Sequence, residues 1–288
     1  MSTSPAIADE PLDSAAAPVR LVATDIDGTL LRSDGTVSDR TRAALQAAGD
    51  RGLLVAFVTG RPPRWLDVLV EQTGHFGLAV GANGAVIYDM GTEQILAAHL
   101  LDQPLMLELG AELLAAFPRV QFAVEYGRGF AGEPGYVHDW AINPPYDRRG
   151  VPIAPPRVGS FEEITDEPGV KLLAKDRQAD ADTFMNKAIQ LVGDRATITH
   201  SSSYGLLEIS APGVTKATGL AELARSYGVP AGEVVAIGDM PNDLPMLQWA
   251  GRSYAVANAH PDVRALADEV VVSNDEDAVA RLIESLLA

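Results

Sequence analysis

Short apolar runs alternate with helical patterns from residue 19 to the end of the chain. Strand-like apolar runs occupy residues 19–26, 53–58, 78–89, 204–211 and 234–238, and the continuous run 53–58 is typical of a strand covered on both faces. Apolar positions at helical spacing follow in residues 38–52, 216–228 and 243–251, and Ser38 is placed to cap the first of these helices. Strands that alternate with helices predict the α/β class, with a doubly wound, largely parallel Rossmann-like sheet.

The middle third of the chain follows a different pattern. Two helical stretches, 104–117 and 183–193, are separated by strand-like runs and by a segment with five prolines, 143–159, which predicts a loop. We interpret this third as an inserted α+β domain. The expected division is a core domain formed by residues 19–85 and 205–288 and an inserted domain formed by residues 86–204.

Composition narrows the classes of function. The chain has 288 residues, 47% hydrophobic and 21% charged, with a formal net charge of −17. An acidic chain argues against nucleic acid as a partner, because phosphate backbones are bound through clustered Lys and Arg. There is no cysteine, which excludes disulfides, thiolate nucleophiles and cysteine-bound zinc.

The sequence also lacks the signals of export and membrane insertion. No apolar run approaches the roughly 18 residues that span a bilayer. Residues 1–18 lack the basic and apolar regions of a secretory signal, and their Ser, Ala, Pro and acidic content predicts a disordered tail. We therefore expect a cytoplasmic protein without a membrane partner, and the sequence leaves its oligomeric state open.

Asp25 and Asp27 come directly after the first buried run, in the string TDIDGTL. Ligands of open α/β sheets sit at the carboxyl ends of the strands, and two residues two apart project to the same side of a strand. Asp-Gly also suits a turn that only ends a strand. A calcium loop does not fit, because its twelfth position would need Glu and here is Thr36, and a strand rather than a helix leads in.

A second acidic cluster follows another buried run, in the string AIGDMPNDLPML. Asp239 leaves the strand, and Asp243 lies one helical turn further on if a helix has begun. Asn242 or Asp243 would also suit the N-cap of that helix. Capping accounts for one of these residues and leaves Asp239 unexplained.

Two further strand or helix ends carry groups suited to an anion. Lys216 opens a predicted helix, where the macrodipole disfavours a cation by roughly 0.3–1 kcal/mol. An exposed Lys could tolerate that cost, whereas a functional one would point at an anion bound at the helix N-terminus. Thr59, Gly60 and Arg61 end a third apolar run, and their hydroxyl and N–H groups could hold phosphate oxygens.

This ordered set resembles the haloacid dehalogenase superfamily of phosphotransferases. The matching strings are DxDGTL at 25–30, Thr59, Lys216 and GDxxND at 238–243. Further strings resemble the Cof-type subgroup, namely VTGR at 58–61, NGA at 83–85, GVTKATGL at 213–220 and NA at 258–259. The subgroup's VAMGNA string stands here as AVANA, so the loop around Asn258 is expected to contact the site differently.

The resemblance implies a role for each matching residue. Asp25 would attack phosphorus and become an aspartyl-phosphate, and Asp27 would protonate the leaving group and later deprotonate water. The backbone at Ile26, Thr59 and Gly60 would hold the phosphoryl oxygens. Lys216 and Asn242 would complete this phosphate-binding set.

The resemblance and the charge balance both imply a magnesium ion. Four aspartates would meet a phosphate that carries about −1.5 to −2 charges at neutral pH, and one Lys cannot balance them. Magnesium suits a few carboxylate or carbonyl oxygens. The expected ligands are Asp25, the Asp27 carbonyl and Asp239, with Asp243 outside them or linked to Lys216.

The resemblance further implies that the inserted cap selects the substrate, a small phosphorylated metabolite such as a sugar phosphate. For each candidate in the cap, an ordinary surface or packing role is the favoured alternative. The candidates in the core are Arg61 and Asn83, and those in the cap are Glu125, Arg128, His138, Trp140 and His200.

Other functions remain open at this point. GRGFAG at 127–132 fits a dinucleotide fingerprint, but Glu133, Pro134 and Gly135 follow and predict a loop where that fingerprint needs a helix. A phosphomutase of the same superfamily would share the chemistry of Asp25. A non-enzymatic sensor on this scaffold is the third alternative. The sequence does not identify the phosphate ester or its pathway.

Overall fold

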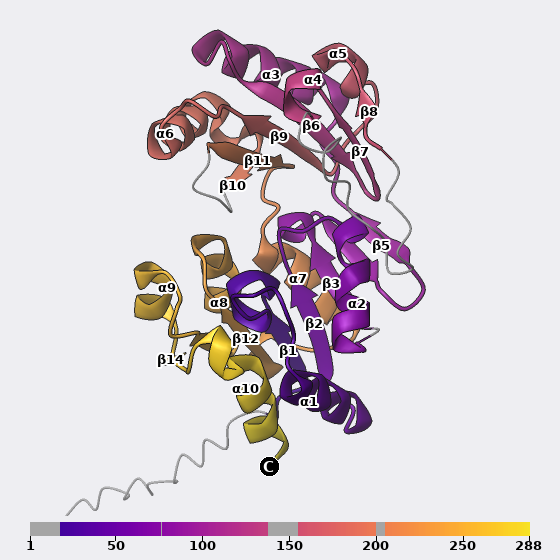
Figure 1. Cartoon of the computed structure of the whole chain (residues 1–288), viewed down its shortest axis with the longest axis vertical. Coiled ribbons are helices and arrows are strands. Elements are labelled where there is room, and N and C mark those ends of the chain that lie inside the picture. The colour runs from indigo at the N-terminus through magenta and orange to yellow at the C-terminus, as the bar shows by residue number, and fades with distance from the viewer. Residues whose placement is uncertain (1–17, 76, 138–154, 200–204) are drawn as a thin grey trace, which may run out of the picture.

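The computed structural model describes residues 18–75, 77–137, 155–199 and 205–288, which form two sheets stacked one above the other (Figure 1). The larger sheet has the order β14-β13-β12-β1-β2-β3-β4-β5. Its first six strands in this order pair in parallel, and β4 and β5 add an antiparallel hairpin at one edge. The strands are β1 (Leu21–Thr24), β2 (Leu54–Val58), β3 (Leu78–Gly81), β4 (Val86–Asp89), β5 (Gln94–Ala98), β12 (Val234–Gly238), β13 (Arg252–Ala255) and β14 (Glu269–Val270).

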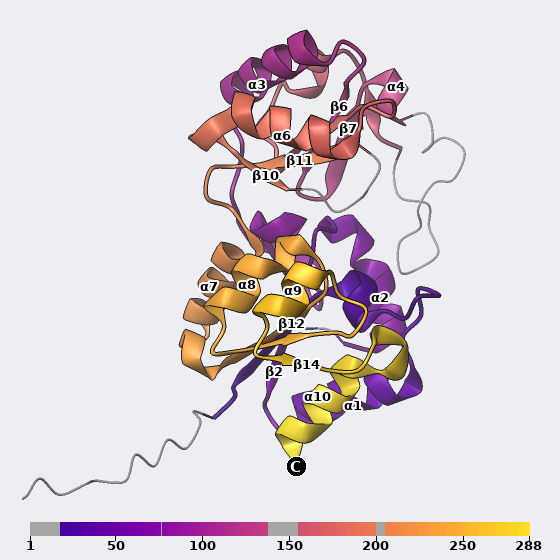
Figure 2. The same cartoon turned by 90° about the vertical axis from the view of Figure 1, so that its left-hand side faces the viewer.

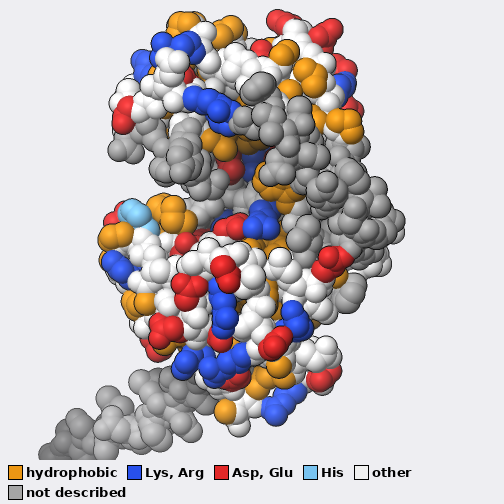
Figure 3. Space-filling view, in the orientation of Figure 1, with side chains coloured by type: hydrophobic (Ala, Val, Ile, Leu, Met, Phe, Trp, Pro, Cys, Tyr) orange, Lys and Arg blue, Asp and Glu red, His pale blue; other side chains and the backbone are white. Residues whose placement is uncertain are grey.

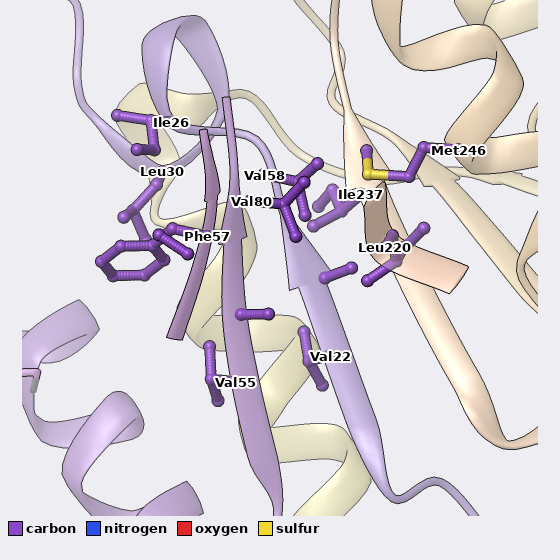
Figure 4. Close-up of a cluster of buried hydrophobic side chains, with 14 of the residues drawn as sticks. Val22, Ile26, Leu30, Val55, Phe57, Val58, Val80, Leu220, Ile237 and Met246 are labelled. Atoms are coloured by element: carbon purple, nitrogen blue, oxygen red, sulfur yellow. The ribbon is translucent and has the colours of Figure 1, made fainter. Parts of the chain in front are cut away.

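Helices cover both faces of this sheet, as the predicted doubly wound arrangement requires. Helices α7 (Lys216–Ser226), α8 (Leu244–Trp249) and α9 (Pro261–Leu266) lie on one face (Figure 2), and α1 (Asp39–Asp50), α2 (Asp67–Thr73) and α10 (Ala278–Leu287) lie on the other. Ser38 caps α1 by accepting a hydrogen bond from the Thr41 N–H, as predicted. Phe57 and Val58, neighbours in β2, point to opposite faces (Figure 4), which explains why the run 53–58 is apolar throughout. The predicted fold class is confirmed.

The smaller sheet is the core of the inserted domain. Its order is β10-β11-β9-β6-β7-β8, antiparallel except for the β7–β8 pair. The strands are β6 (Gln121–Tyr126), β7 (Gly129–Gly132), β8 (Arg157–Val158), β9 (Lys171–Lys175), β10 (Thr197–Thr199) and β11 (Leu206–Ser210). The helices are α3 (Gln103–Ala116), α4 (Pro134–Val137), α5 (Phe161–Ile164) and α6 (Ala181–Val192).

Alternation along these strands gives the smaller sheet two different faces. Phe122, Leu172 and Ile209 belong to an apolar core shared with α3, α5 and α6. The neighbouring positions on the opposite face include two charged side chains, Lys171 and Glu208, that are nevertheless buried. Because a strand turns alternate residues to opposite faces, these charges lie on the side away from that apolar core, which is the side that faces the larger sheet.

The expected domain boundaries differ from the strand pairing at both ends of the insert. Residues 86–98 form the β4–β5 hairpin of the larger sheet, so the insert begins after β5 rather than at residue 86. The run 204–211 was expected in the larger sheet, but its strand β11 pairs with β9 and β10 in the smaller one. An apolar strand looks the same in sequence whichever sheet it joins, so only the pairing fixes the boundary.

Two smaller expectations also meet the structure here. Residues 129–132 of the GRGFAG string form strand β7, paired antiparallel with β6, so no dinucleotide-binding helix opens at this string. The expected loop at residues 133–135 is wrong, because the short helix α4 begins at Pro134. Within the described ranges, none of the helices is both long and apolar enough to cross a bilayer. The predicted tail falls almost wholly outside those ranges.

Candidate active site

Asp25 stands at the carboxyl end of β1, between β12 and β2, which lead into Asp239 and Thr59. Its backbone N–H donates to the Ile237 carbonyl of β12 at 3.0 Å, which fixes it beside the residues that follow β12. Thr59 follows β2 on the other side, with its own N–H donating to the Val80 carbonyl of β3 at 2.9 Å. Three parallel strands therefore end together, and Asp25, Asp239 and Thr59 follow them, as the strand-end argument predicted.

Lys216 joins two of the acidic residues. Its ammonium donates to Asp25 Oδ1 and to Asp243 Oδ1, each at 2.6 Å, and all three side chains are buried. Lys216 is the first residue of α7, whose N-terminus Thr215 caps by accepting from the Thr218 N–H. Two carboxylates within hydrogen-bond distance stabilise the ammonium by more than the helix macrodipole opposes it. The exposed-lysine alternative is therefore excluded.

Asp243 and Asp239 are held by separate sets of donors. Asp243 Oδ2 accepts from the backbone N–H groups of Asp239 and Met240, both at 3.0 Å. Asp239 Oδ1 accepts from the Thr29 hydroxyl at 3.1 Å. Asp243 thus braces the turn after β12 with one oxygen while its other oxygen holds Lys216, so capping describes only half of its contacts.

The crowding of carboxylates is visible in their acidity. Burial raises the pKa of Asp25 well above its usual value, and the nearby Asp243 and Asp239 charges raise it further against the opposing effect of Lys216. Burial and the Asp243 carboxylate raise the pKa of Asp239 to about 6. Burial acts to lower the pKa of Lys216, but Asp243 and Asp25 outweigh it and hold that pKa above its usual value. The cluster therefore has more negative charge than its one lysine compensates.

This cluster has the donor set of a hard divalent cation. Asp25, Asp239 and Asp243 each offer a carboxylate oxygen, and these oxygens lie within 4.8 Å of one another. All-oxygen sites of this kind suit Mg²⁺, Ca²⁺ or Mn²⁺, and a cation would offset both the burial and the carboxylate charges that raise the two pKa values. The residues present therefore fit the expected magnesium. The Asp27 carboxylate is not in the cluster, and the assignment of its carbonyl as a ligand stays a prediction.

Asp27 projects to the open side of the site, where Arg61 holds it. Arg61 Nε donates to Asp27 Oδ2 at 2.8 Å, and its Nη2 donates to Asp27 Oδ1. The Asp27 side chain is 58% exposed. Both residues line a cavity of about 580 Å³ together with Gly28 and Asn258, whose side-chain amide donates to the Gly28 carbonyl at 2.8 Å. The loop at Asn258 thus contacts the site through the Asn258 side chain, which binds the backbone of Gly28.

Asn83 lies behind Gly60 and meets Asn242. Asn242 Nδ2 donates to Asn83 Oδ1 at 3.2 Å, and the Asn83 N–H donates to the Thr59 carbonyl at 2.9 Å. Ile26 and Thr59 are buried as well. Asn83 therefore links Thr59, which follows β2, to Asn242, which follows β12, and both are expected to hold a phosphoryl group. From the sequence, Asn83 was a candidate for substrate contact.

The candidates in the cap have different outcomes. Glu125 is buried in β6 with Arg64 Nη2 at 3.2 Å from its Oε1, so it contacts the larger domain at Arg64. Arg128 donates to the Tyr88 hydroxyl and lies 3.8 Å from the Glu93 carboxylate, which places it at the β4–β5 hairpin. His138, Trp140 and His200 lie outside the described residues.

Three residues at the junction of the two sheets are not evident from the sequence. Arg64, Lys171 and Glu208 are all buried, and each reaches across from one sheet to the other. The available signal was a charged residue inside an otherwise apolar strand, as in KLLAK and LLEIS. The space-filling view shows the molecule hollowed between the two parts, with acidic and basic side chains at the hollow (Figure 3).

The whole arrangement matches a known family. The family model described as haloacid dehalogenase-like hydrolase matches residues 22–283, and the chain belongs to that family. The predicted resemblance, to its phosphatases of the Cof-type subgroup, is confirmed. The chain is therefore an enzyme of the phosphatase class.

Individual relatives cover nearly the whole chain. The chain is 27% identical to the 5-amino-6-(5-phospho-D-ribitylamino)uracil phosphatase YitU of Bacillus subtilis, over 92% of this chain and 96% of the relative. It is 28% identical to the phosphatase YwpJ of the same organism, over 93% and 100%. A solved haloacid dehalogenase-like hydrolase from B. subtilis superimposes with a TM-score of 0.77 at 25% identity, over 92% and 99%.

Proposed function

We propose that this enzyme is a magnesium-dependent phosphatase that hydrolyses a small organic phosphate monoester through an aspartyl-phosphate on Asp25. The observation that carries the proposal is the environment of Asp25. It is buried at the end of the central strand, its Oδ1 lies 2.6 Å from the Lys216 ammonium, and Asp239 and Asp243 converge on it. This geometry suits a nucleophile held in one orientation beside a cation site.

In the first half-reaction Asp25 attacks phosphorus. Lys216 occupies Oδ1, which leaves Oδ2 to form the new bond to phosphorus as the bond to the leaving oxygen breaks. Asp27 supplies the proton that this oxygen takes up, a contribution of typically ~10²–10⁴ in rate. The products are the aspartyl-phosphate and the alcohol.

In the second half-reaction Asp27 acts as a base. It takes a proton from a water molecule whose oxygen attacks phosphorus, and the Asp25–phosphorus bond breaks to release inorganic phosphate. The position of Asp27 supports this role, since it is two residues from Asp25 and lines the open cavity. Arg61 holds the Asp27 carboxylate in place and is in reach of an anionic group that enters the cavity.

The phosphoryl oxygens would be held by groups at the ends of three strands. The backbone at Ile26 and Gly60 and the Thr59 hydroxyl would donate from two of them, and Lys216 and Asn242 would donate from the other side. Asp25, the Asp27 carbonyl and Asp239 would hold magnesium, with Asp243 beside them. When bound, the ion would neutralise charge that develops on the phosphoryl group.

The substrate class follows from the cap and from the relatives. YitU is named for a substrate in which a phosphorylated ribityl chain is joined to a uracil ring. We extend this to a sugar phosphate or a similar phosphorylated metabolite for this enzyme, chosen by groups in the cap such as Glu125. Arg61 would contact the part of the ester nearest phosphorus.

A screen of phosphate release tests the proposal. Purified enzyme with Mg²⁺ is offered a panel of sugar, nucleotide and cofactor phosphates, with the Asp25→Asn variant as the control. Net release of inorganic phosphate by the wild type alone supports a phosphatase. Transfer of the phosphoryl group between positions of a sugar, without release, would identify the phosphomutase alternative. Binding without turnover would favour the sensor.

A further inference from the structure

Two buried charged residues of the cap, Lys171 in β9 and Glu208 in β11, carry a further inference. Lys171 Nζ lies 3.4 Å from Glu208 Oε2, and the side chains of Lys171 and Glu208 are only 1% and 9% exposed. Taking such a pair out of water costs several kcal/mol per ion, and the cost is offset only when further hydrogen bonds satisfy both groups. Those further bonds are made to the catalytic domain.

Lys171 binds the backbone of the expected phosphate loop. Its ammonium donates to the Gly60 carbonyl at 2.9 Å, at the end of β2. Gly60 has no side chain, so the cap restrains the position of this residue through its backbone carbonyl. A charge-assisted bond to this carbonyl restrains the peptide unit between Gly60 and Arg61.

Glu208 holds the neighbouring loop. Its Oε2 accepts from Asn83 Nδ2, and the same amide donates to the Thr199 hydroxyl of β10 at 2.9 Å. Asn83 has a φ of +57°, a left-handed conformation that Asn adopts more readily than most residues. Two strands of the cap therefore grip one side chain of the catalytic domain.

The bonds continue from Asn83 to the groups expected to touch phosphate. Asn83 Oδ1 accepts from Asn242 Nδ2 at 3.2 Å, and its N–H donates to the Thr59 carbonyl. A change at Lys171 or Glu208 is thus transmitted to Gly60, Thr59 and Asn242 without contact with the substrate. These bonds require the smaller sheet to lie against the larger one.

We propose that Lys171 and Glu208 are positioning residues that assemble the phosphate-binding loops when the cap closes on the core, an inference that rests on the proposed function. The cap then contributes to binding of the phosphoryl group itself, in addition to selecting the leaving group. A small ester that barely reaches the cap depends on these two residues as much as a large one does.

The test compares orthophosphate binding and turnover in matched variants. Lys171→Met keeps the length and apolar stem of the side chain and removes its charge, Lys171→Arg restores a cation, and Glu208→Gln removes the partner charge. Lys187→Met, on the exposed side of α6, is the control for loss of a cap lysine. The Kd of inorganic phosphate with Mg²⁺ is measured by calorimetry, kcat/KM is measured for p-nitrophenyl phosphate and a sugar phosphate, and circular dichroism checks folding.

We expect Lys171→Met to weaken phosphate binding about 10-fold or more and to lower kcat/KM equally for both esters, with partial rescue in Lys171→Arg and no change in Lys187→Met. The Lys171→Met/Glu208→Gln double variant should lose less than the product of the single losses, because the two act through one set of bonds. Wild-type phosphate affinity in folded Lys171→Met or Glu208→Gln would overturn the inference, as would an effect on the sugar phosphate alone. If no ester is hydrolysed but phosphate binds in a Lys171-dependent way, the proposed function fails and the positioning role stands.

Discussion

Gly28 lies so close to Asp239 that a Cβ atom on Gly28 would overlap the Asp239 carboxylate. Gly28 also has a φ of +78°, in the left-handed region that favours glycine. The turn after β1 and the carboxylate after β12 are therefore packed against each other, with room for hydrogen only. This contact ties the nucleophile's own turn to the expected cation site.

Gly28→Ala should therefore damage the cation site beyond its effect on the backbone. The matched control is Gly52→Ala, since Gly52 has a φ of +75° and open space around its Cβ position. Both variants should lose about 1–2 kcal/mol of unfolding free energy from the strained φ. Only Gly28→Ala should also require much more Mg²⁺ for half-maximal activity, by about 10-fold or more. Equal Mg²⁺ requirements in the two variants would contradict the packing argument.

Removal of Lys216 should cost both stability and activity. Lys216→Met leaves Asp25 and Asp243 buried without their shared cation, and such losses amount to about 3–5 kcal/mol. Urea denaturation in EDTA measures this loss, and Mg²⁺ should restore part of it. Turnover of p-nitrophenyl phosphate and of larger esters should fall together. If Lys216→Met had the same unfolding free energy in EDTA as the wild type, the ammonium would not be the group that balances these carboxylates.

Mg²⁺ binding should weaken as the pH falls through about 6. Burial and the Asp243 carboxylate raise the pKa of Asp239 to about 6, so below that pH a proton occupies the group that the cation needs. The same raised pKa stabilises the metal-free fold fully below the usual aspartate value of about 4, and this contribution is lost as the pH rises through about 6. The increase in Tm caused by Mg²⁺ should therefore grow between about pH 5 and pH 7. A constant increase across that range would contradict the assignment of Asp239 to the cation site.

Glu125 offers a test of where leaving-group selection resides. It lies opposite Lys171 in the β6–β9 pairing and faces Arg64 of the catalytic domain. Glu125→Gln keeps the shape and removes the charge, so we expect a changed ranking of sugar, nucleotide and cofactor phosphates. Hydrolysis of p-nitrophenyl phosphate should change little. An unchanged ranking across the panel would place selection elsewhere in the cap.

The sequence predicts the catalytic end of the sheet well because polar and charged residues interrupt the hydrophobic pattern there. Asp25, Thr59, Lys216 and Asp239 each stand where an apolar run ends or a helix begins, and the structure brings these four ends together. The parallel sheet predicts that meeting, since strand ends share one edge. Individual contacts, such as those of Lys216 with both Asp25 and Asp243, depend on how the elements pack and cannot be read from the spacing of residues in the sequence.

The cap could not be delimited or interpreted in the same way. The strands β4 and β11 have the same apolar character in either sheet, so the sequence misassigns both. The role of Lys171 and Glu208 depends on their bonds to Gly60 and Asn83, which lie more than a hundred residues away in the sequence. Contacts between segments so distant in the chain follow only from the fold.

The central claim is a covalent phosphate ester on Asp25, and trapping it is the most direct measurement. Asp27→Asn should slow the attack of water while still allowing phosphoryl transfer from p-nitrophenyl phosphate, whose leaving group needs no proton. Acid quenching followed by peptide mass spectrometry should then find one phosphoryl group on the peptide that contains Asp25, and none in the Asp25→Asn/Asp27→Asn protein. Turnover by Asp27→Asn with no phosphorylated peptide, or with the phosphoryl group on another residue, would contradict the account.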